Sequence, residues 1–402
     1  MPAYSGKFQY SGGSGEPLSQ GACQVDFEEE TCTVTPAAGI PIAFDLGDVD
    51  SLARSDWELA LKLYTGNTVA LRQFGPAFGR IADELTAAWR DRTVQCLLLE
   101  DLEEVARSNG AASGVPAEIR IYQSNLATLP VDGLPSQWRL ADVDAMRFDE
   151  AAYNVTLESG GQKLVISKLA KKTGEFVSTL TGTLDALRKK SADALHNTFP
   201  FLDPDRLRRL LTVMPEGRSV KLAALGAIHP KLPEALIGRA VDPRLKPYFD
   251  ELRSRAVADS LMAGFKFVRD DEEPAEEPAA EEPAAQEEKS PLFFWFFFPL
   301  AGKNVAVWES TMGSGRATYF FRAAPPLDAA IASLTRGLAL VNFRREPVYL
   351  PDDSLEQQPR FHRYAIGARK LPDLRNLRAA FLGRAIHSSV EAWGAQVGSV
   401  AG

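Results

Sequence analysis

The chain has 402 residues, of which 45% are hydrophobic and 24% are charged, a composition typical of folded globular proteins. Its length exceeds what one hydrophobic core usually covers, so we expect several domains. The net charge of −8 argues against a protein that coats nucleic acid. Three irregularly spaced cysteines fit neither a disulfide framework nor a zinc site, so we expect a reducing, cytoplasmic environment.

The first residues predict neither export nor membrane insertion. The stretch MPAYSGKFQYSGGSGEP has no basic segment followed by an apolar one, and we expect residues 1–19 to be a flexible N-terminus. The longest apolar run, residues 292–300, has nine residues. A helix needs roughly 20 apolar residues to span a membrane, so we expect no transmembrane segment.

A repeat with an offset of 94 residues organises the first half of the chain. FDLGDVDSL at residues 44–52 and WRLADVDAM at residues 138–146 share this offset. Around them, residues 25–66 align with residues 119–160 without a gap, and nine of the 42 positions are identical. Composition alone would give roughly two or three identities. We therefore predict two copies of one structural unit, at residues 20–110 and 115–198.

Each copy reads as a series of strands followed by one helix. Apolar and polar residues alternate in residues 25–28 and 59–63, with the two-residue period of half-buried strands. A helical period follows, marked by Phe78, Ile81, Leu85 and Trp89 in the first copy and by Phe176, Leu180, Leu184 and Leu187 in the second. We predict about five strands and one closing amphipathic helix in each copy.

The stretch IPIAFDLGDVDSL…WELALKLYTGNTVALRQFG resembles the bacterial pleckstrin-homology-like (PH-like) and GRAM-like families, in which an apolar-Asp-apolar strand precedes a hairpin and the helix. The resemblance covers about residues 20–100 and 115–198 and implies tandem PH-like domains with a binding or scaffolding role. Phosphoinositide-binding PH domains carry Lys and Arg in their first hairpin loop. The turns that we align with that loop, EEET at 28–31 and YQSN at 122–125, carry none, which argues against phosphoinositide binding.

The two DVD segments supply four acids, which are Asp48, Asp50, Asp142 and Asp144. Alternating carboxylates on a strand can hold Mg²⁺ for a phosphate-bearing substrate. Their repetition in both copies instead favours a constraint of the fold, with acids that face solvent, cap loops or deter edge pairing. We therefore expect no metal and no cofactor.

The hairpin around residues 29–30 also bears on the cysteines. A turn centred there places Phe27 opposite Cys32 and Val25 opposite Val34, which leaves Cys23 out of register with Cys32 for a disulfide bond. Both thiols are predicted to be free core residues.

After the repeats, residues 199–263 read as a helical connector, with Asp203 as a helix cap before Pro204. A C-terminal α/β domain is expected over residues 264–402. We predict that GFKFV at 264–268 pairs with FFWFFF at 293–298, around a disordered acidic insertion at residues 270–290. The six aromatic residues read either as a membrane or partner surface or as a strand buried on both faces, and we favour the strand. Helical spacing returns at residues 326–341 and 371–393.

The sequence contains none of the strong catalytic motifs: no H-E-x-x-H, no Cys-x-x-Cys, no G-x-S-x-G and no phosphate-binding loop. His362, in RFHRYAIGARK, is the one histidine that we would nominate as a general base; the alternative is a partly exposed polar residue near a strand. We predict no catalytic residue.

One basic segment stands out in this acidic chain. Residues 360–384 contain seven bases and a single acid, Asp373, with an apolar helical stripe at Leu371, Leu374, Leu377 and Phe381. Such a segment binds an anionic membrane, contacts RNA phosphate, or docks on its own domain with a solvated basic face. The candidate binding residues are Arg360, Arg363, Arg369, Lys370, Arg375, Arg378 and Arg384.

Together these patterns predict a mixed α+β protein with two tandem PH-like units, a helical connector and a C-terminal α/β domain. The predicted function is that of a cytoplasmic, non-catalytic adaptor or scaffold for protein partners or, as a peripheral protein, for anionic membrane surfaces. Two alternatives stay open: an enzyme with a site near His362, and RNA binding through residues 360–384, which the net charge disfavours.

Overall fold

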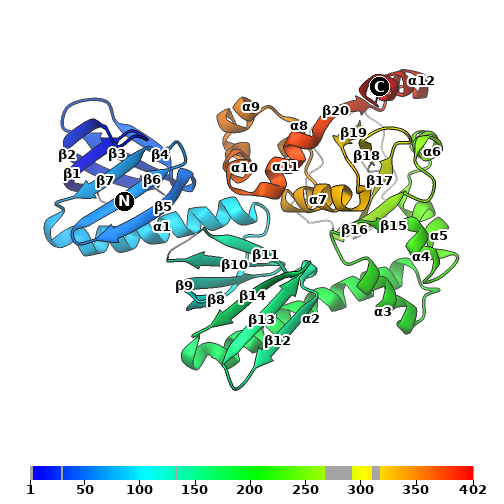
Figure 1. Ribbon diagram of the computed structural model, residues 1–402, viewed down its shortest axis with the longest axis horizontal. Coiled ribbons are helices and arrows are strands. Elements are labelled where there is room, and N and C mark those ends of the chain that lie inside the picture. The colour runs from blue at the N-terminus through cyan, green and yellow to red at the C-terminus, as the bar shows by residue number, and fades with distance from the viewer. Residues whose placement is uncertain (1–2, 29, 132–133, 268–291, 310–316, 402) are drawn as a thin grey trace, which may run out of the picture. The chain divides into compact units, whose positions relative to one another are not determined.

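The computed structural model describes residues 3–28, 30–131, 134–267, 292–309 and 317–401, and it combines helices with antiparallel sheets (Figure 1). The chain divides into two units. The first contains Met1–Thr179 and Asp352–Lys370, and the second contains Leu180–Pro351 and Leu371–Gly402. This division differs from the expected domains, because part of the C-terminal region belongs to the first unit. The predicted acidic insertion lies outside the described residues.

The first sheet has seven antiparallel strands in the order β4-β3-β2-β1-β7-β6-β5. They are β1 (Tyr4–Ser11), β2 (Pro17–Glu28), β3 (Thr31–Pro36), β4 (Ile42–Asp45), β5 (Val49–Ser55), β6 (Glu58–Leu63) and β7 (Thr68–Arg72). A single 3₁₀ turn, η1 (Leu46–Asp48), joins β4 to β5. A second turn, η2 (Gly75–Ala77), leads into the helix α1 (Phe78–Leu98).

The second sheet repeats this order as β11-β10-β9-β8-β14-β13-β12. Its strands are β8 (Glu104–Ala112), β9 (Val115–Tyr122), β10 (Asn125–Pro130), β11 (Ser136–Arg139), β12 (Ala145–Asp149), β13 (Asn154–Ser159) and β14 (Gln162–Ser167). The turns η3 (Leu140–Asp142) and η4 (Ala170–Lys172) and the helix α2 (Thr173–Thr198) follow the same plan. The shared strand order that the repeat predicts is confirmed, with seven strands in each copy instead of about five.

The expectation of a flexible N-terminus was wrong, because residues 4–11 form the strand β1. This strand pairs with both β2 and β7, and it buries the side chains of Tyr4 and Phe8. Its aromatic residues Tyr4, Phe8 and Tyr10 alternate with polar residues, which is the two-residue period of a half-buried strand. The loop after β1, residues 12–16, is therefore the true first hairpin loop of this copy, and it too lacks a basic residue.

Hairpin register in the first sheet follows the prediction. Val25 pairs with Val34, and Phe27 pairs with Cys32. Cys23 lies opposite Pro36, and all three cysteines of the chain are free and buried.

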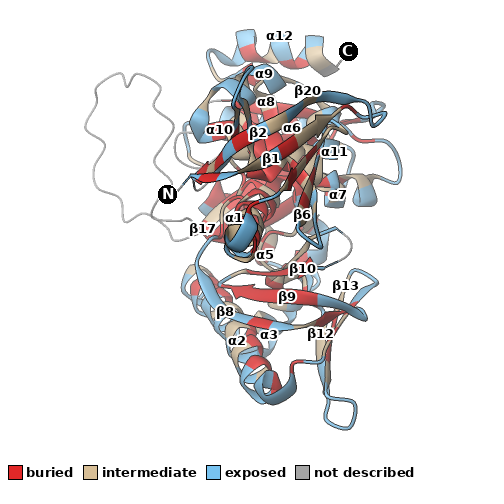
Figure 2. Ribbon diagram, turned by 90° about the vertical axis from the view of Figure 1, so that its left-hand side faces the viewer, coloured by how far each residue is buried: buried red, intermediate tan, exposed pale blue. Residues whose placement is uncertain are grey.

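Both closing helices are amphipathic, as predicted. Phe78, Ile81 and Leu85 of α1 lie in the core of the first sheet, and Trp89 packs against its edge. The last turns of α1 also pack on the second sheet, where Val94 joins a cluster with Tyr122, Ala127 and Leu129. Most of β9 is buried, as Figure 2 shows in red. The helix α1 thus packs against the sheets of both copies within the first unit.

The second unit contains a six-stranded sheet in the order β15-β16-β17-β18-β19-β20. Its strands are β15 (Val220–Lys221), β16 (Met262–Phe267), β17 (Leu292–Pro299), β18 (Val305–Glu309), β19 (Ala317–Arg322) and β20 (Phe381–Ile386). Its helices, besides the end of α2, are α3 (Pro204–Val213), α4 (Leu222–Gly226), α5 (Leu232–Ala240), α6 (Lys246–Arg255), α7 (Leu327–Leu340), α8 (Glu346–Tyr349), α11 (Pro372–Ala380) and α12 (Val390–Ala401).

Several predictions for this unit are confirmed. The strand β16 pairs antiparallel with the aromatic strand β17. Phe294 and Phe296 face one cluster, which includes residues of α3 to α6, whereas the Trp295 ring contacts the Phe343 ring on the other side. The aromatic run is therefore a strand buried on both faces. Asp203 caps α3 by accepting a hydrogen bond from the backbone of Arg206.

The helix expected over residues 371–393 is interrupted, and this expectation was wrong. Residues 381–386 form β20, which pairs with β19 from Ala317 to Phe321. Gly383 has a φ of +153°, which a helix cannot contain. Pairing with a partner strand overrides the helical spacing of the apolar residues. Among the described residues, no helix is both long and apolar enough to cross a membrane.

We expect the three cysteines to resist iodoacetamide in mildly alkaline buffer while the protein is native. Burial raises the pKa of Cys32 and of Cys96 to about 12, and it also raises the pKa of Cys23, so few thiolates form. Peptide mapping by mass spectrometry measures the labelling, and all three should react in concentrated guanidinium chloride. Rapid native labelling of Cys32 would contradict the β2–β3 core packing.

Candidate functional site

The first unit holds a helical hairpin from a distant part of the chain. It consists of α9 (Asp352–Gln357) and α10 (Pro359–Lys370), and α10 packs against α1 and η1 beside the C-terminal part of α1 (Figure 1). Proline is tolerated in the first turn of a helix, so α10 begins at Pro359. Pro372 disfavours helical backbone at the residue before it, and α10 ends at Lys370.

The packing of α10 on η1 and on the C-terminal end of α1 depends on two glycines. A methyl group added at Gly47 would lie 2.8 Å from Cys96 Sγ and 3.0 Å from Ile366 Cδ1. A methyl group at Gly367 would lie 3.0 Å from Leu99 Cδ2. These distances are shorter than ordinary van der Waals contacts, so only glycine fits without movement of its neighbours.

Apolar side chains of α10 fill the space above these glycines. Ile366 is fully buried, and Phe361 and Tyr364 are nearly so. Burial raises the pKa of Tyr364, so its hydroxyl group stays protonated and donates a hydrogen bond to the Glu100 carboxylate.

The last two residues of α10 pair with the acids of the first DVD segment. Arg369 Nη2 lies 2.5 Å from Asp48 Oδ1. Lys370 Nζ lies 3.0 Å from the carbonyl oxygen of Val49 and 3.4 Å from Asp50 Oδ1. The expectation that these acids face solvent is therefore wrong for Asp48, whose side chain is 16% exposed and bound to a distant helix.

Burial and pairing act on Asp48 in opposite directions. Burial raises the pKa of its carboxyl group above the ordinary value, and the charge of Arg369 opposes that rise without cancelling it. The free-energy cost of removing the Asp48 carboxylate from water thus exceeds the gain from its ion pair with Arg369. We infer that the pair orients α10 more than it stabilises the fold.

Beneath α10, a buried guanidinium fixes the position of η1. Arg92, 3% exposed, donates to both oxygens of Asp45, over 2.9 and 2.7 Å, and it lies 2.6 Å from Glu30. Asp45 also accepts a hydrogen bond from the backbone of Gly47. We call the surface formed by Asp45, Gly47, Asp48, Asp50, Cys96 and Leu99 the helix-docking face.

His362 belongs to this arrangement, and it lies within a helix rather than near a strand. Its Nε2 is 3.5 Å from Asp45 Oδ2, and its Nδ1 is 3.1 Å from the carbonyl oxygen of Glu356. Both ring nitrogens therefore face partners in the first unit. Asp45 is already bound by Arg92. The contacts of His362 with Asp45 and Glu356 therefore help to position α10, and neither ring nitrogen is directed at a substrate.

The seven candidate binding residues are divided between the two units. Arg360, Arg363, Arg369 and Lys370 lie in α10 of the first unit, whereas Arg375, Arg378 and Arg384 lie in the second unit. Several have internal partners. Arg360 lies over Phe361, Arg363 over Tyr364 and Arg384 over Tyr349, and Arg378 donates to the carbonyl oxygens of Pro347 and Leu350.

Sequence reasoning missed the residues that receive α10, among them Gly47, Arg92 and Cys96. The helix itself left a signal, because Phe361, Tyr364 and Ala368 follow an i, i+3, i+7 spacing between two prolines. Nothing in the sequence indicated which surface that helix would meet.

A buried cluster in the second unit contains a threonine, a glutamate and a histidine, which are residue types found in hydrolase sites. Their geometry differs from that of a catalytic triad. Thr318 Oγ1 lies 2.5 Å from Glu309 Oε2 and 3.0 Å from His387 Nε2. The same ring nitrogen is 3.3 Å from Glu309. A catalytic triad needs the hydroxyl group and the acid on different ring nitrogens. Trp393 also donates to Thr318, whereas the second carboxylate oxygen of Glu309, Oε1, is buried without a hydrogen-bond partner among the residues that the structure describes.

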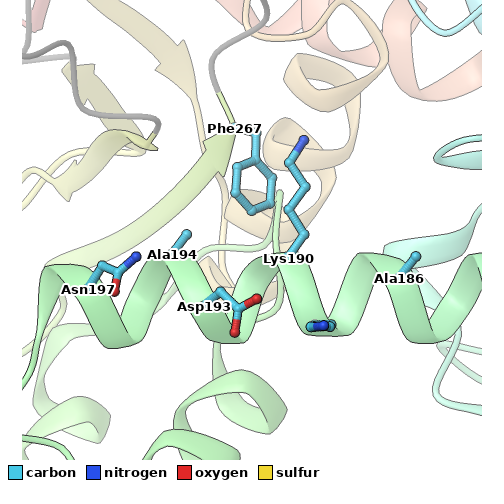
Figure 3. Close-up of a pocket in the computed structure, with 7 residues that line it drawn as sticks. Ala186, Lys190, Asp193, Ala194, Asn197 and Phe267 are labelled. Carbon is cyan, nitrogen blue, oxygen red and sulfur yellow. The ribbon is translucent and has the colours of Figure 1, made fainter.

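A hollow of about 480 Å³ lies beside α2 in the second unit (Figure 3). Its lining residues are Ala186, Lys189, Lys190, Asp193, Ala194, Asn197 and Phe267. Lys190 Nζ stands 4.3 Å from the centre of the Phe267 ring. The polar groups belong to an exposed helix face and do not converge on a point, so the hollow has the character of ordinary surface.

Comparison with known proteins adds no family to this geometry. The chain matches no family model and no curated protein. Among the described residues, no group of three or more His, Cys, Asp or Glu side chains is placed to hold a metal ion.

We expect Gly47→Ala to destabilise the protein by about 1–3 kcal/mol, because the added methyl group has no room against Cys96 and Ile366. Gly79→Ala in α1 is the matched control, since a methyl group there meets open space and alanine favours a helix by about 1 kcal/mol. Urea unfolding midpoints measure both. Equal effects of the two substitutions would contradict the close packing of α10 on η1.

Proposed function

We propose that the protein is a non-catalytic binding or scaffold protein whose two tandem sheet units are PH-like domains that hold other polypeptides. The order of strands followed by a closing helix, present twice, supports the PH-like interpretation. We place the protein in the cytoplasm, because its three cysteines are free.

The observation that carries this proposal is the docked helix α10. The first sheet unit holds a helix from more than 250 residues away in the sequence, through an apolar slot flanked by carboxylates. Amphipathic helices in apolar grooves are a recurring mode of recognition between proteins. The geometry therefore favours protein partners.

The same contacts weigh against an anionic surface or RNA as the main partner. Arg369 and Lys370 are engaged by acids of the first unit, and Arg378 binds backbone carbonyl oxygens. Release of these bases to bind phosphate would break those contacts. A phosphate-binding surface normally presents its cations together and free of internal acids.

The first test asks whether charge pairing holds α10 on the helix-docking face. We expect Arg369→Glu with Lys370→Glu to raise iodoacetamide labelling of Cys96 about tenfold or more, which corresponds to ~1.4 kcal/mol of lost docking. Cys96 reports docking because a methyl group at Gly47 would meet both its Sγ and the Ile366 side chain, which places the thiol at the contact with α10. Cys23 and Cys32, in the sheet core, are the internal controls and should stay protected.

A compensating variant completes this test. Addition of Asp48→Lys and Asp50→Lys to the same chain restores opposite charges and should protect Cys96 again. Should Cys96 stay protected in the first variant, and also in Ile366→Ser, α10 would not be held through this face and the proposal would fail.

The second test separates protein binding from membrane binding. We expect the full chain not to sediment with vesicles of anionic phospholipid at physiological salt, because Arg369 and Lys370 of α10 are internally paired. Co-sedimentation that is lost in an Arg360→Glu variant would point instead to peripheral membrane binding.

A further inference from the structure

We propose that the helix-docking face is a receptor for a basic amphipathic helix of another protein, and that α9 and α10 are its resident competitor. This inference deepens the proposed function and rests on it, because it concerns the same face. It assigns that face both a partner chemistry and a mode of regulation.

We expect α9 and α10, the resident hairpin, to separate from the helix-docking face as a single unit. It enters the first unit after Pro351 and returns to the second unit at Leu371. Pro351 and Pro372 prevent helical hydrogen bonding from running on at either junction. Within the hairpin, Glu356 binds Arg369 over 2.8 Å, so α9 and α10 stay together when they separate from the face.

The contacts that hold the hairpin are of the kind found in exchangeable interfaces. The buried part of α10 is short, comprising Phe361 and the four residues from Tyr364 to Gly367, and ion pairs lie at its C-terminal end. The side chains of Arg369 and Asp50 are 23% and 41% exposed. Such rim charges select a partner and set the rate of encounter more than they add affinity.

The face also defines what its partner must look like. Gly47 leaves a space that takes an aliphatic side chain, as Ile366 does. Glu100 accepts a hydrogen bond from an aromatic hydroxyl group, as it does from Tyr364. Asp48 and Asp50 require two adjacent bases at the C-terminal end of the helix, where cations are also favoured by the helix dipole. The partner helix therefore follows the pattern of α10: aromatic, aromatic, Ile-Gly, then Arg-Lys.

The second copy lacks this chemistry although it shares the strand order. Ala141 stands at the position of Gly47, and Arg139 stands at the position of Asp45. Arg139 lies 3.4 Å from Asp142, within its own copy. The two differences remove the slot and reverse one charge, so a basic helix is expected to select the first copy alone.

The experiment uses two labelled peptides and four full-length chains, the wild type and three variants. One peptide has the sequence of residues 352–370, and the other carries Arg369→Glu and Lys370→Glu. The acidic-face chain carries the same two substitutions, which open the face and leave its acids intact. The basic-face chain carries Asp48→Lys and Asp50→Lys, and the restored chain carries all four substitutions.

Fluorescence anisotropy should show a reciprocal pattern. The acidic-face chain should bind the native peptide at least about tenfold more tightly than it binds the reversed peptide, and the basic-face chain should show the opposite preference. The wild-type and restored chains should bind both peptides at least about tenfold more weakly, because the resident hairpin occupies the face.

Cys96 labelling distinguishes the two possible failures. If Cys96 is exposed in the acidic-face chain and neither peptide binds with charge preference, the face holds a helix only within its own chain, and this inference is overturned while the proposed function stands. Ile366→Ser offers a second way to open the face. If Cys96 stays protected in both variants, the proposed function fails together with the inference.

Discussion

The arrangement of the first unit depends on one buried cation. Arg92 reaches from α1 into the space below η1, where Asp45 binds it twice and Glu30 binds it from the β2–β3 turn. A guanidinium 3% exposed cannot stay there without these carboxylates, because an unpaired buried charge costs several kcal/mol. The same Asp45 holds the backbone of Gly47 and faces His362 of α10. Asp45 thus contacts the helix α1, the turn η1 and the docked hairpin together.

The two copies illustrate how one architecture acquires different surfaces. Both sheets have the same strand order and the same 3₁₀ turn before the fifth strand, so the backbone plan is shared. At that turn, glycine in the first copy becomes alanine in the second, and aspartate becomes arginine. A methyl group and a reversed charge thus distinguish the two turns, and close packing accommodates neither overlap nor an unpaired charge without cost.

Where the sequence predicted structure well, the information was local. The register of Phe27 against Cys32 followed from the position of the turn, and the pairing of β16 with β17 followed from two apolar runs. The strand β20 shows the opposite case. It lies in a stretch with helical spacing, yet it is a strand because the neighbouring strand β19 satisfies its backbone groups.

By itself, the sequence determined the repeat, the alternation of its strands and the caps of its helices, because periodicity and turn chemistry act over a few residues. It also revealed four acids in the DVD segments and a cluster of bases near residue 370. Only the tertiary structure decided that Lys370 meets Asp50, 320 residues away, and that Gly47 admits Ile366. Such contacts leave no local periodicity in the sequence, since they depend on how separate elements pack and not on the elements themselves.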